Sequence, residues 1–134
     1  MTFENDGSPP VESIDRLLAI GLAAGRIAIG AGLWVAPQRS ARALGFAALD
    51  QPGLALARIA GSRDLVLGVA QLGSLAERAP LRRATLCAAA ADGADVATFA
   101  LALRAPETRK AGARGLPVAA VAALAGAWLA SRLR

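Results

Sequence analysis

The chain alternates between long apolar stretches and short polar connections that contain proline. Four apolar stretches cover residues 17–36, 54–76, 84–103 and 116–133, and each holds 18–23 residues. A helix of about 20 apolar residues crosses the hydrocarbon core of a bilayer. Ala and Leu dominate the stretches, and both residues favour helix. The pattern predicts an all-α fold, namely an integral membrane four-helix bundle.

The prolines support these boundaries. Proline lacks a backbone N–H, so it does least harm between helices or at their edges. All seven prolines lie at such places: Pro9, Pro10, Pro37, Pro52, Pro80, Pro106 and Pro117.

Composition agrees with a membrane protein. Hydrophobic residues make up 55% of the chain and the mean hydropathy is +0.46, whereas ordinary soluble domains are about 45–50% apolar. The alternative is a soluble, Ala-rich bundle. Its helices would carry a broad polar stripe, and these stretches carry only a few central charges.

The N-terminal segment differs from the rest. We expect residues 1–14 to form a flexible acidic tail before a single domain of residues 15–134. The first sixteen residues have the wrong charge for the basic start of a signal peptide, with Glu4, Asp6, Glu12 and Asp15 against Arg16.

Several chemistries are excluded. The chain has one cysteine, Cys87, and no histidine, which excludes an intrachain disulfide, a histidine-based triad, a histidine-ligated haem and the usual zinc sites. We expect no metal and no cofactor.

The net charge of +5 could suggest nucleic acid, but the basic residues are dispersed and aromatic residues make up only 4%. Anionic lipid headgroups are the expected partner instead.

The basic residues do not decide the orientation of a multi-pass protein in the cell membrane. Twelve of them lie outside the stretches or at their ends, six on each side of a four-span arrangement, so the positive-inside rule gives no majority. The dense group Arg78, Arg82 and Arg83 favours a cytoplasmic middle loop, and hence cytoplasmic termini.

Away from the stretch ends, six charged residues lie inside the apolar stretches. An ionised group at mid-bilayer costs about 2.5–3.5 kcal/mol on insertion scales, so such groups are usually paired or functional. Five of them share one central level, while Arg58 lies nearer the interface, where its side chain can snorkel. The six residues are Arg26, Arg58, Arg63, Asp64, Asp92 and Asp95.

Helical spacing predicts that the central five form a network. Asp92 and Asp95 are three residues apart and share a helix face, and we expect Arg26 and Arg63 to reach the carboxylates of the second and third stretches. Small residues let another helix approach closely, and one stripe of the second stretch combines them with polar side chains: Gly61, Asp64, Gly68 and Gln71. Gly21 and Gly25 form a further small-x3-small pattern, of a kind that is common by chance.

The central five carry two positive and three negative charges. An apolar layer resists a net charge, and clustered carboxylates disfavour one another's ionisation. We therefore expect one of Asp64, Asp92 and Asp95 to be protonated at neutral pH.

The network has two interpretations. Buried Arg–Asp pairs can simply fix helix register, which suits Arg63 and Asp64 best. Asp92 and Asp95 are the candidates for catalysis, because two acids on one face carry more charge than one arginine neutralises. We expect Cys87 to be a small buried hydrophobe and Trp34 and Trp128 to be interface anchors.

One connection is longer than a turn. Residues 37–52 suit either a short helix in the membrane interface, with Arg39 and Arg42 on its polar side, or an ordinary loop.

The chain resembles the small DoxX-like bacterial membrane proteins, in a branch of unknown function, over residues 14–134. The residues concerned are a first stretch rich in glycine around Arg26, the pattern Arg58-x4-Arg63-Asp64-x3-Gly68, and an acidic third stretch. The resemblance implies a four-helix membrane bundle with accessory roles in membrane redox or quinone-linked systems. It implies no catalytic residues.

Three classes of function fit these residues. The first, which we favour, is an accessory or binding protein whose charged core holds a lipophilic molecule such as a quinone, isoprenoid or lipid. The second is a membrane-embedded acid–base enzyme (isomerase, cyclase or epoxide-opening) that uses Asp92 and Asp95. The third is a proton-coupled transporter, which requires a homo-oligomer because four helices make a thin pathway. A membrane partner protein is compatible with the first class.

Overall fold

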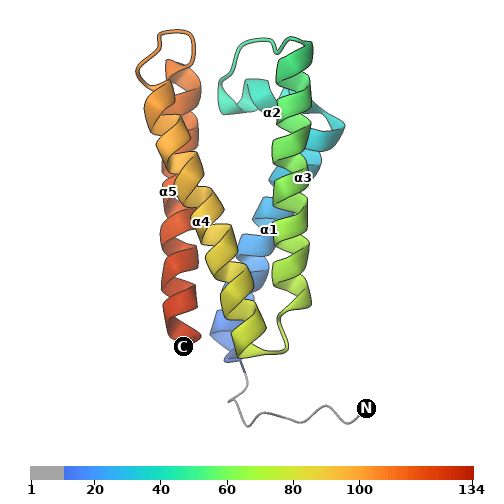
Figure 1. The fold of residues 1–134 in the computed structure, drawn as a ribbon, viewed down its shortest axis with the longest axis vertical. Coiled ribbons are helices and arrows are strands. Elements are labelled where there is room, and N and C mark those ends of the chain that lie inside the picture. The colour runs from blue at the N-terminus through green and yellow to red at the C-terminus, as the bar shows by residue number, and fades with distance from the viewer. Residues whose placement is uncertain (1–10) are drawn as a thin grey trace.

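The computed structural model describes residues 11–134. Within that range the chain is helical and has no strand, so the predicted all-α fold is confirmed (Figure 1). The helices are α1 (Ser13–Val35), α2 (Pro37–Leu44), α3 (Gln51–Gly73), α4 (Arg78–Ala102) and α5 (Arg109–Arg132).

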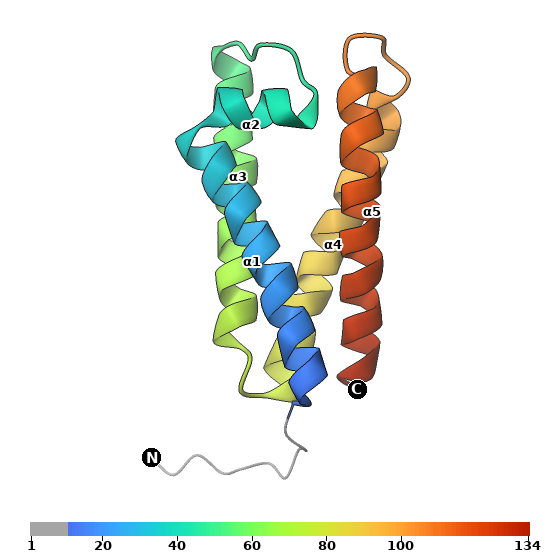
Figure 2. The same cartoon turned by 180° about the vertical axis from the view of Figure 1, so that it is seen from behind.

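The long helices form two antiparallel pairs. α1 packs along α3, and α4 packs along α5, while contacts between the pairs are fewer. The pairs meet near the end that holds the start of α1, the α3–α4 turn and the C-terminus, and they diverge toward the end that carries α2 (Figures 1 and 2).

The predicted spans lie mostly within these helices, but their ends differ. α4 begins at Arg78 and α5 at Arg109, before the apolar stretches that start at residues 84 and 116. Arg and Ala favour helix, so the helices continue through these polar segments. The expectation that all prolines avoid helix interiors is wrong for Pro117, which lies inside α5. A proline there leaves the carbonyl four residues earlier without its helical donor.

The connection at residues 37–52 contains a short helix, α2. Pro37 occupies the first turn, where a missing N–H costs little. Gly45 ends the helix with a φ of 95°, a left-handed conformation that glycine adopts without strain. A Cβ at Gly45 would lie 3.0 Å from the carbonyl oxygen of Lys110. The end of α2 therefore contacts the start of α5 and links the two helix pairs.

Three helices are long and apolar enough to cross a membrane: α1, α4 and α5. α3, which has Arg58, Arg63 and Asp64 in its middle part, is not among them. Large apolar side chains are exposed on all four long helices. Such a surface is typical of contact with lipid or with a partner protein.

Glycine brings α1 and α3 into close contact. A Cβ at Gly61 would lie 2.7 Å from the carbonyl oxygen of Gly30, and the reverse distance is the same. The predicted polar and small stripe of α3 is confirmed, because its four residues, Gly61, Asp64, Gly68 and Gln71, are the buried ones of that helix. Gly21 and Gly25 have no neighbouring atom within 4 Å of a Cβ position, so they make no close helix contact.

The apolar core lies where the two pairs meet. It consists of Ala19, Leu81, Leu129 and Leu133, with Val11 packed against it. Residues 1–10 of the predicted tail lie outside the described residues. From residue 11 onward the segment is structured, since Val11 packs against the core and α1 begins at Ser13.

Candidate charged-core site

The fold brings five of the six predicted charged residues into one network. α1 supplies Arg26, α3 supplies Arg63 and Asp64, and α4 supplies Asp92 and Asp95. The network therefore joins both helix pairs.

Arg26 bridges α3 and α4. Its Nη1 donates to Oδ1 of Asp64 at 3.2 Å, and its Nη2 pairs with Oδ2 of Asp92. Nη2 also donates to the backbone carbonyl of Ala88 at 3.3 Å. Because three acceptors surround the guanidinium, the charge is well compensated in its buried position.

Arg63 makes the second bridge. Its Nη1 and Nη2 donate to the two oxygens of Asp95 at 3.0 and 2.7 Å. Its Nε and Nη2 also donate to Oδ1 of Asp64, at 3.2 and 3.1 Å. The expectation that Arg26 and Arg63 reach the carboxylates of the second and third stretches agrees with these ion pairs.

The network is a chain of alternating charges with two different ends. Its order is Asp92, Arg26, Asp64, Arg63, Asp95. At the closed end, Arg26 and Asp92 have side chains only 9% and 12% exposed. At the open end, Arg63 and Asp95 are 38% and 30% exposed. Each of Asp92 and Asp95 has its own arginine, so the two acids do not share a single cation.

Arg58 lies apart from the network. It is exposed, and within residues 11–134 it forms no ion pair.

The expectation of a buried Cys87 is wrong, because its side chain is exposed on α4. Both faces of α4 there are rich in alanine, so the sequence gives no sign of which face turns inward.

The two tryptophans are exposed near helix ends. Trp34 is 50% exposed and Trp128 is 52% exposed. Trp34 Nε1 donates to Ser62 Oγ at 2.9 Å, and the guanidinium of Arg132 lies 5.2 Å from the Trp128 ring centroid. An apolar ring with a polar contact suits the predicted interface position.

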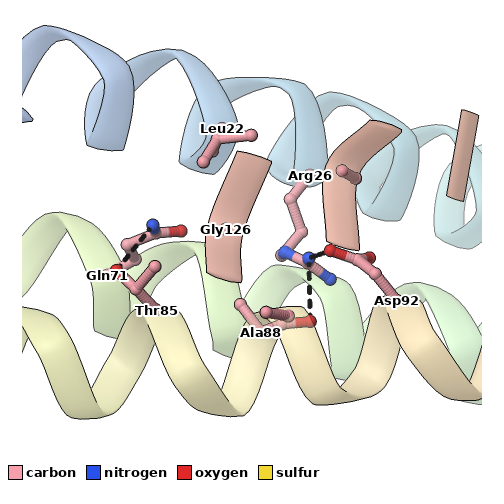
Figure 3. Close-up of a pocket in the computed structure, with 9 residues that line it drawn as sticks. Leu22, Arg26, Gln71, Thr85, Ala88, Asp92 and Gly126 are labelled. Carbon is pink, nitrogen blue, oxygen red and sulfur yellow. Dashed lines mark hydrogen bonds and ion pairs between the residues drawn. The ribbon is translucent and has the colours of Figure 1, made fainter. Parts of the chain in front are cut away.

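A small cavity adjoins the closed end (Figure 3). It has room for about 10 Å³, which corresponds to about one water molecule. Gln71 and Thr85 lie on its other side, and Gln71 Nε2 donates to Thr85 Oγ1 at 3.1 Å. The lining is Leu22, Arg26, Gln71, Thr85, Ala88, Ala89, Asp92, Ala122 and Gly126.

A second ionic cluster was not identified from the sequence. Asp15 in the first turn of α1 is 1% exposed and accepts from Arg132 Nε at 2.6 Å. Glu12 pairs with Arg132 at 3.2 Å and with Arg78 at 3.9 Å. These contacts tie α1 to α4 and α5 at the end where the helix pairs meet. The only sign of this cluster in the sequence is the position of two residues. Asp15 lies shortly before the first apolar stretch, and Arg132 lies at the end of the last one.

Comparisons with family models, with curated proteins and with solved structures gave no match to this chain.

Proposed function

We propose that this is a four-span integral membrane protein that binds a lipophilic molecule at its charged core. The bound molecule contacts the open end of the network with its polar group. The observation that carries the proposal is the partial exposure of Arg63 and Asp95 on an otherwise apolar surface.

The fourth span in this proposal is α3. It carries three charges, and isolated charges in hydrocarbon are costly. Two of them, Arg63 and Asp64, are paired with other members of the network. The third, Arg58, lies about two turns from the helix start and can extend toward the interface. With 23 residues α3 is as long as α1, so four spans of similar length result.

The surroundings of the open end are apolar. Ile59 and Val66 lie on α3 one turn before and one turn after Arg63, on the same side of the helix, and they are 64% and 68% exposed. Lipid chains cannot hydrogen-bond the exposed part of the Arg63–Asp95 pair. A ligand with an apolar body and a polar head satisfies both surfaces at once.

The candidates for such a ligand are a quinone, an isoprenoid or a lipid headgroup. A guanidinium and a carboxylate side by side offer a donor and an acceptor to the same polar head. The DoxX-like sequence pattern supports an accessory role of this kind in the membrane. The protein would then hold the molecule for a partner protein rather than transform it.

The test is to identify what the purified protein carries. Wild type and the Arg63→Gln/Asp95→Asn double variant are purified in mild detergent, extracted with organic solvent and compared by mass spectrometry. The double variant removes both charges together and so leaves neither one unpaired. We expect a stoichiometric lipid-soluble molecule in the wild type that is strongly reduced in the variant.

The control is Arg58→Gln, which removes a charge from the same helix outside the network. It should retain the molecule. A wild-type protein without any enriched molecule, or equal amounts in all three proteins, would contradict the proposal.

The enzyme and transporter alternatives predict other results. An acid–base enzyme requires Asp92 and Asp95 to act on one substrate, whereas each carboxylate pairs with a separate arginine. A transporter predicts gradient-dependent flux in proteoliposomes and an oligomer in detergent.

A further inference from the structure

Two residues that line the same cavity, Arg26 and Gln71, each have a buried polar atom without a partner. Within residues 11–134, neither Arg26 Nε nor Gln71 Oε1 has a hydrogen-bond partner. The Arg26 side chain is 9% exposed and Gln71 is 1% exposed. Leaving a buried polar group without a hydrogen-bond partner destabilises the folded state. Two such atoms at one cavity indicate that an occupant contacts both.

The two atoms define the chemistry of that occupant. Arg26 Nε–H is a donor and requires an acceptor, while Gln71 Oε1 is an acceptor and requires a donor. A carbonyl oxygen, such as that of a quinone, satisfies only Arg26, and an ammonium group satisfies only Gln71. An inorganic anion would face the amide oxygen and the carboxylate of Asp92, and a metal cation would face the Arg26 guanidinium. The group must therefore be neutral and must both donate and accept.

The volume of the cavity further limits the group that can occupy it. The room of about 10 Å³ fits one oxygen atom with its hydrogens. In Figure 3, Gln71 and Thr85 lie together at one end of the group of lining residues, and Arg26 and Asp92 lie together at the other end. We propose that the cavity is a site for a single buried water molecule that accepts from Arg26 Nε and donates to Gln71 Oε1.

This water has a structural consequence. It joins the Gln71–Thr85 hydrogen bond to the charged network. A continuous hydrogen-bonded chain then runs from Thr85 through Gln71, the water, Arg26, Asp64 and Arg63 to Asp95. The site lies at the closed end, so its occupancy does not depend on the ligand proposed for the open end.

Nuclear magnetic resonance of the full chain in lipid nanodiscs tests the site. The arginine side chains are labelled with ¹⁵N, and magnetisation is transferred selectively from water to the Arg26 Nε–H. In a rotating-frame experiment we expect a cross-peak of sign opposite to the diagonal, which is the sign of dipolar contact with a bound water and not of proton exchange. Absence of the cross-peak in the wild type, or the sign of simple proton exchange, would overturn the proposal.

Two substitutions that roughly keep the size of the original side chain test whether Gln71 Oε1 is the second partner of the water. Gln71→Met removes Oε1, and we expect the cross-peak to lose more than half of its intensity. Thr85→Val removes the other partner of Gln71 and leaves both partners of the water, so the cross-peak should persist. Undiminished intensity in Gln71→Met would contradict the bridge. If that variant does not fold, the sign of the wild-type cross-peak still tests whether a bound water is present.

Discussion

Arg63 in α3 and Asp95 in α4 form a bidentate ion pair, in which two guanidinium nitrogens contact the two carboxylate oxygens. Nη1 lies 3.0 Å from Oδ1, and Nη2 lies 2.7 Å from Oδ2. Such bidentate pairs are stronger and more directional than single contacts. Because the pair joins two helices that otherwise make few contacts, it fixes how the helix pairs meet while part of it stays open to the surroundings.

Loss of Arg26 should destabilise the protein strongly. Arg26→Gln leaves Asp64 and Asp92 without one cation in a buried position, and breaking a buried pair from one side costs about 3–5 kcal/mol. We expect a correspondingly lower midpoint of thermal unfolding in detergent, followed by circular dichroism.

The matched control for this variant is Arg58→Gln. Arg58 is exposed and lies outside the network, so its removal should change the midpoint little. Equal losses in the two variants would mean that the network contributes nothing specific to stability.

A methyl group at Gly61 should separate α1 from α3. In Gly61→Ala the new Cβ would lie 2.7 Å from the Gly30 carbonyl oxygen, so one backbone must move, at a cost of about 1–3 kcal/mol. Gly21→Ala is the control, since no atom lies within 4 Å of its Cβ position. The prediction fails if Gly61→Ala unfolds at or above the midpoint of Gly21→Ala.

The sequence predicts the parts of this structure that depend on helical periodicity. The stripe of Gly61, Asp64, Gly68 and Gln71 follows from spacing alone, and so does the meeting of arginines with aspartates at one level. The way the helices pair does not follow from spacing. It depends on which small residues approach a neighbour, and Gly30 does so while Gly25 does not.

Helix ends and outward faces were harder to predict for a physical reason. Apolar stretches mark the hydrocarbon core, whereas helices continue into polar segments, as α5 does from Arg109 to Leu116. A thiol is compatible with lipid as well as with a protein core, so the exposure of Cys87 does not follow from its polarity. Hydropathy cannot distinguish the two environments.

Cys87 provides a test of membrane insertion. The thiol lies on the exposed face of α4, nine residues from its start, and only the thiolate, which forms in water, reacts rapidly. In liposomes we expect slow labelling by a water-soluble maleimide and rapid labelling after denaturation. A Glu107→Cys/Cys87→Ser variant, with its thiol in the α4–α5 connection, should react rapidly in either state. Rapid labelling of native Cys87 would mean that this part of α4 is in water.

The network should contain one protonated carboxyl group. Its five members carry one excess negative charge, which an apolar layer disfavours. Infrared spectra at neutral pH should show a protonated-carboxyl band that is lost in one of the variants Asp64→Asn, Asp92→Asn and Asp95→Asn. If no Asp→Asn variant of the three removes such a band, all three carboxylates are ionised.

We predict that the end of the network at Asp92 is structural and that the end at Asp95 binds the ligand. Native mass spectrometry of the wild type, Asp92→Asn and Asp95→Asn in the same mild detergent tests this division, with the unfolding midpoint measured on each sample. We predict that Asp92→Asn lowers the midpoint more than Asp95→Asn, and that Asp95→Asn stays folded but loses a bound molecule present in the wild type. An empty wild-type protein, with both variants equally destabilised, would contradict the claim and leave the charges as an assembly device alone.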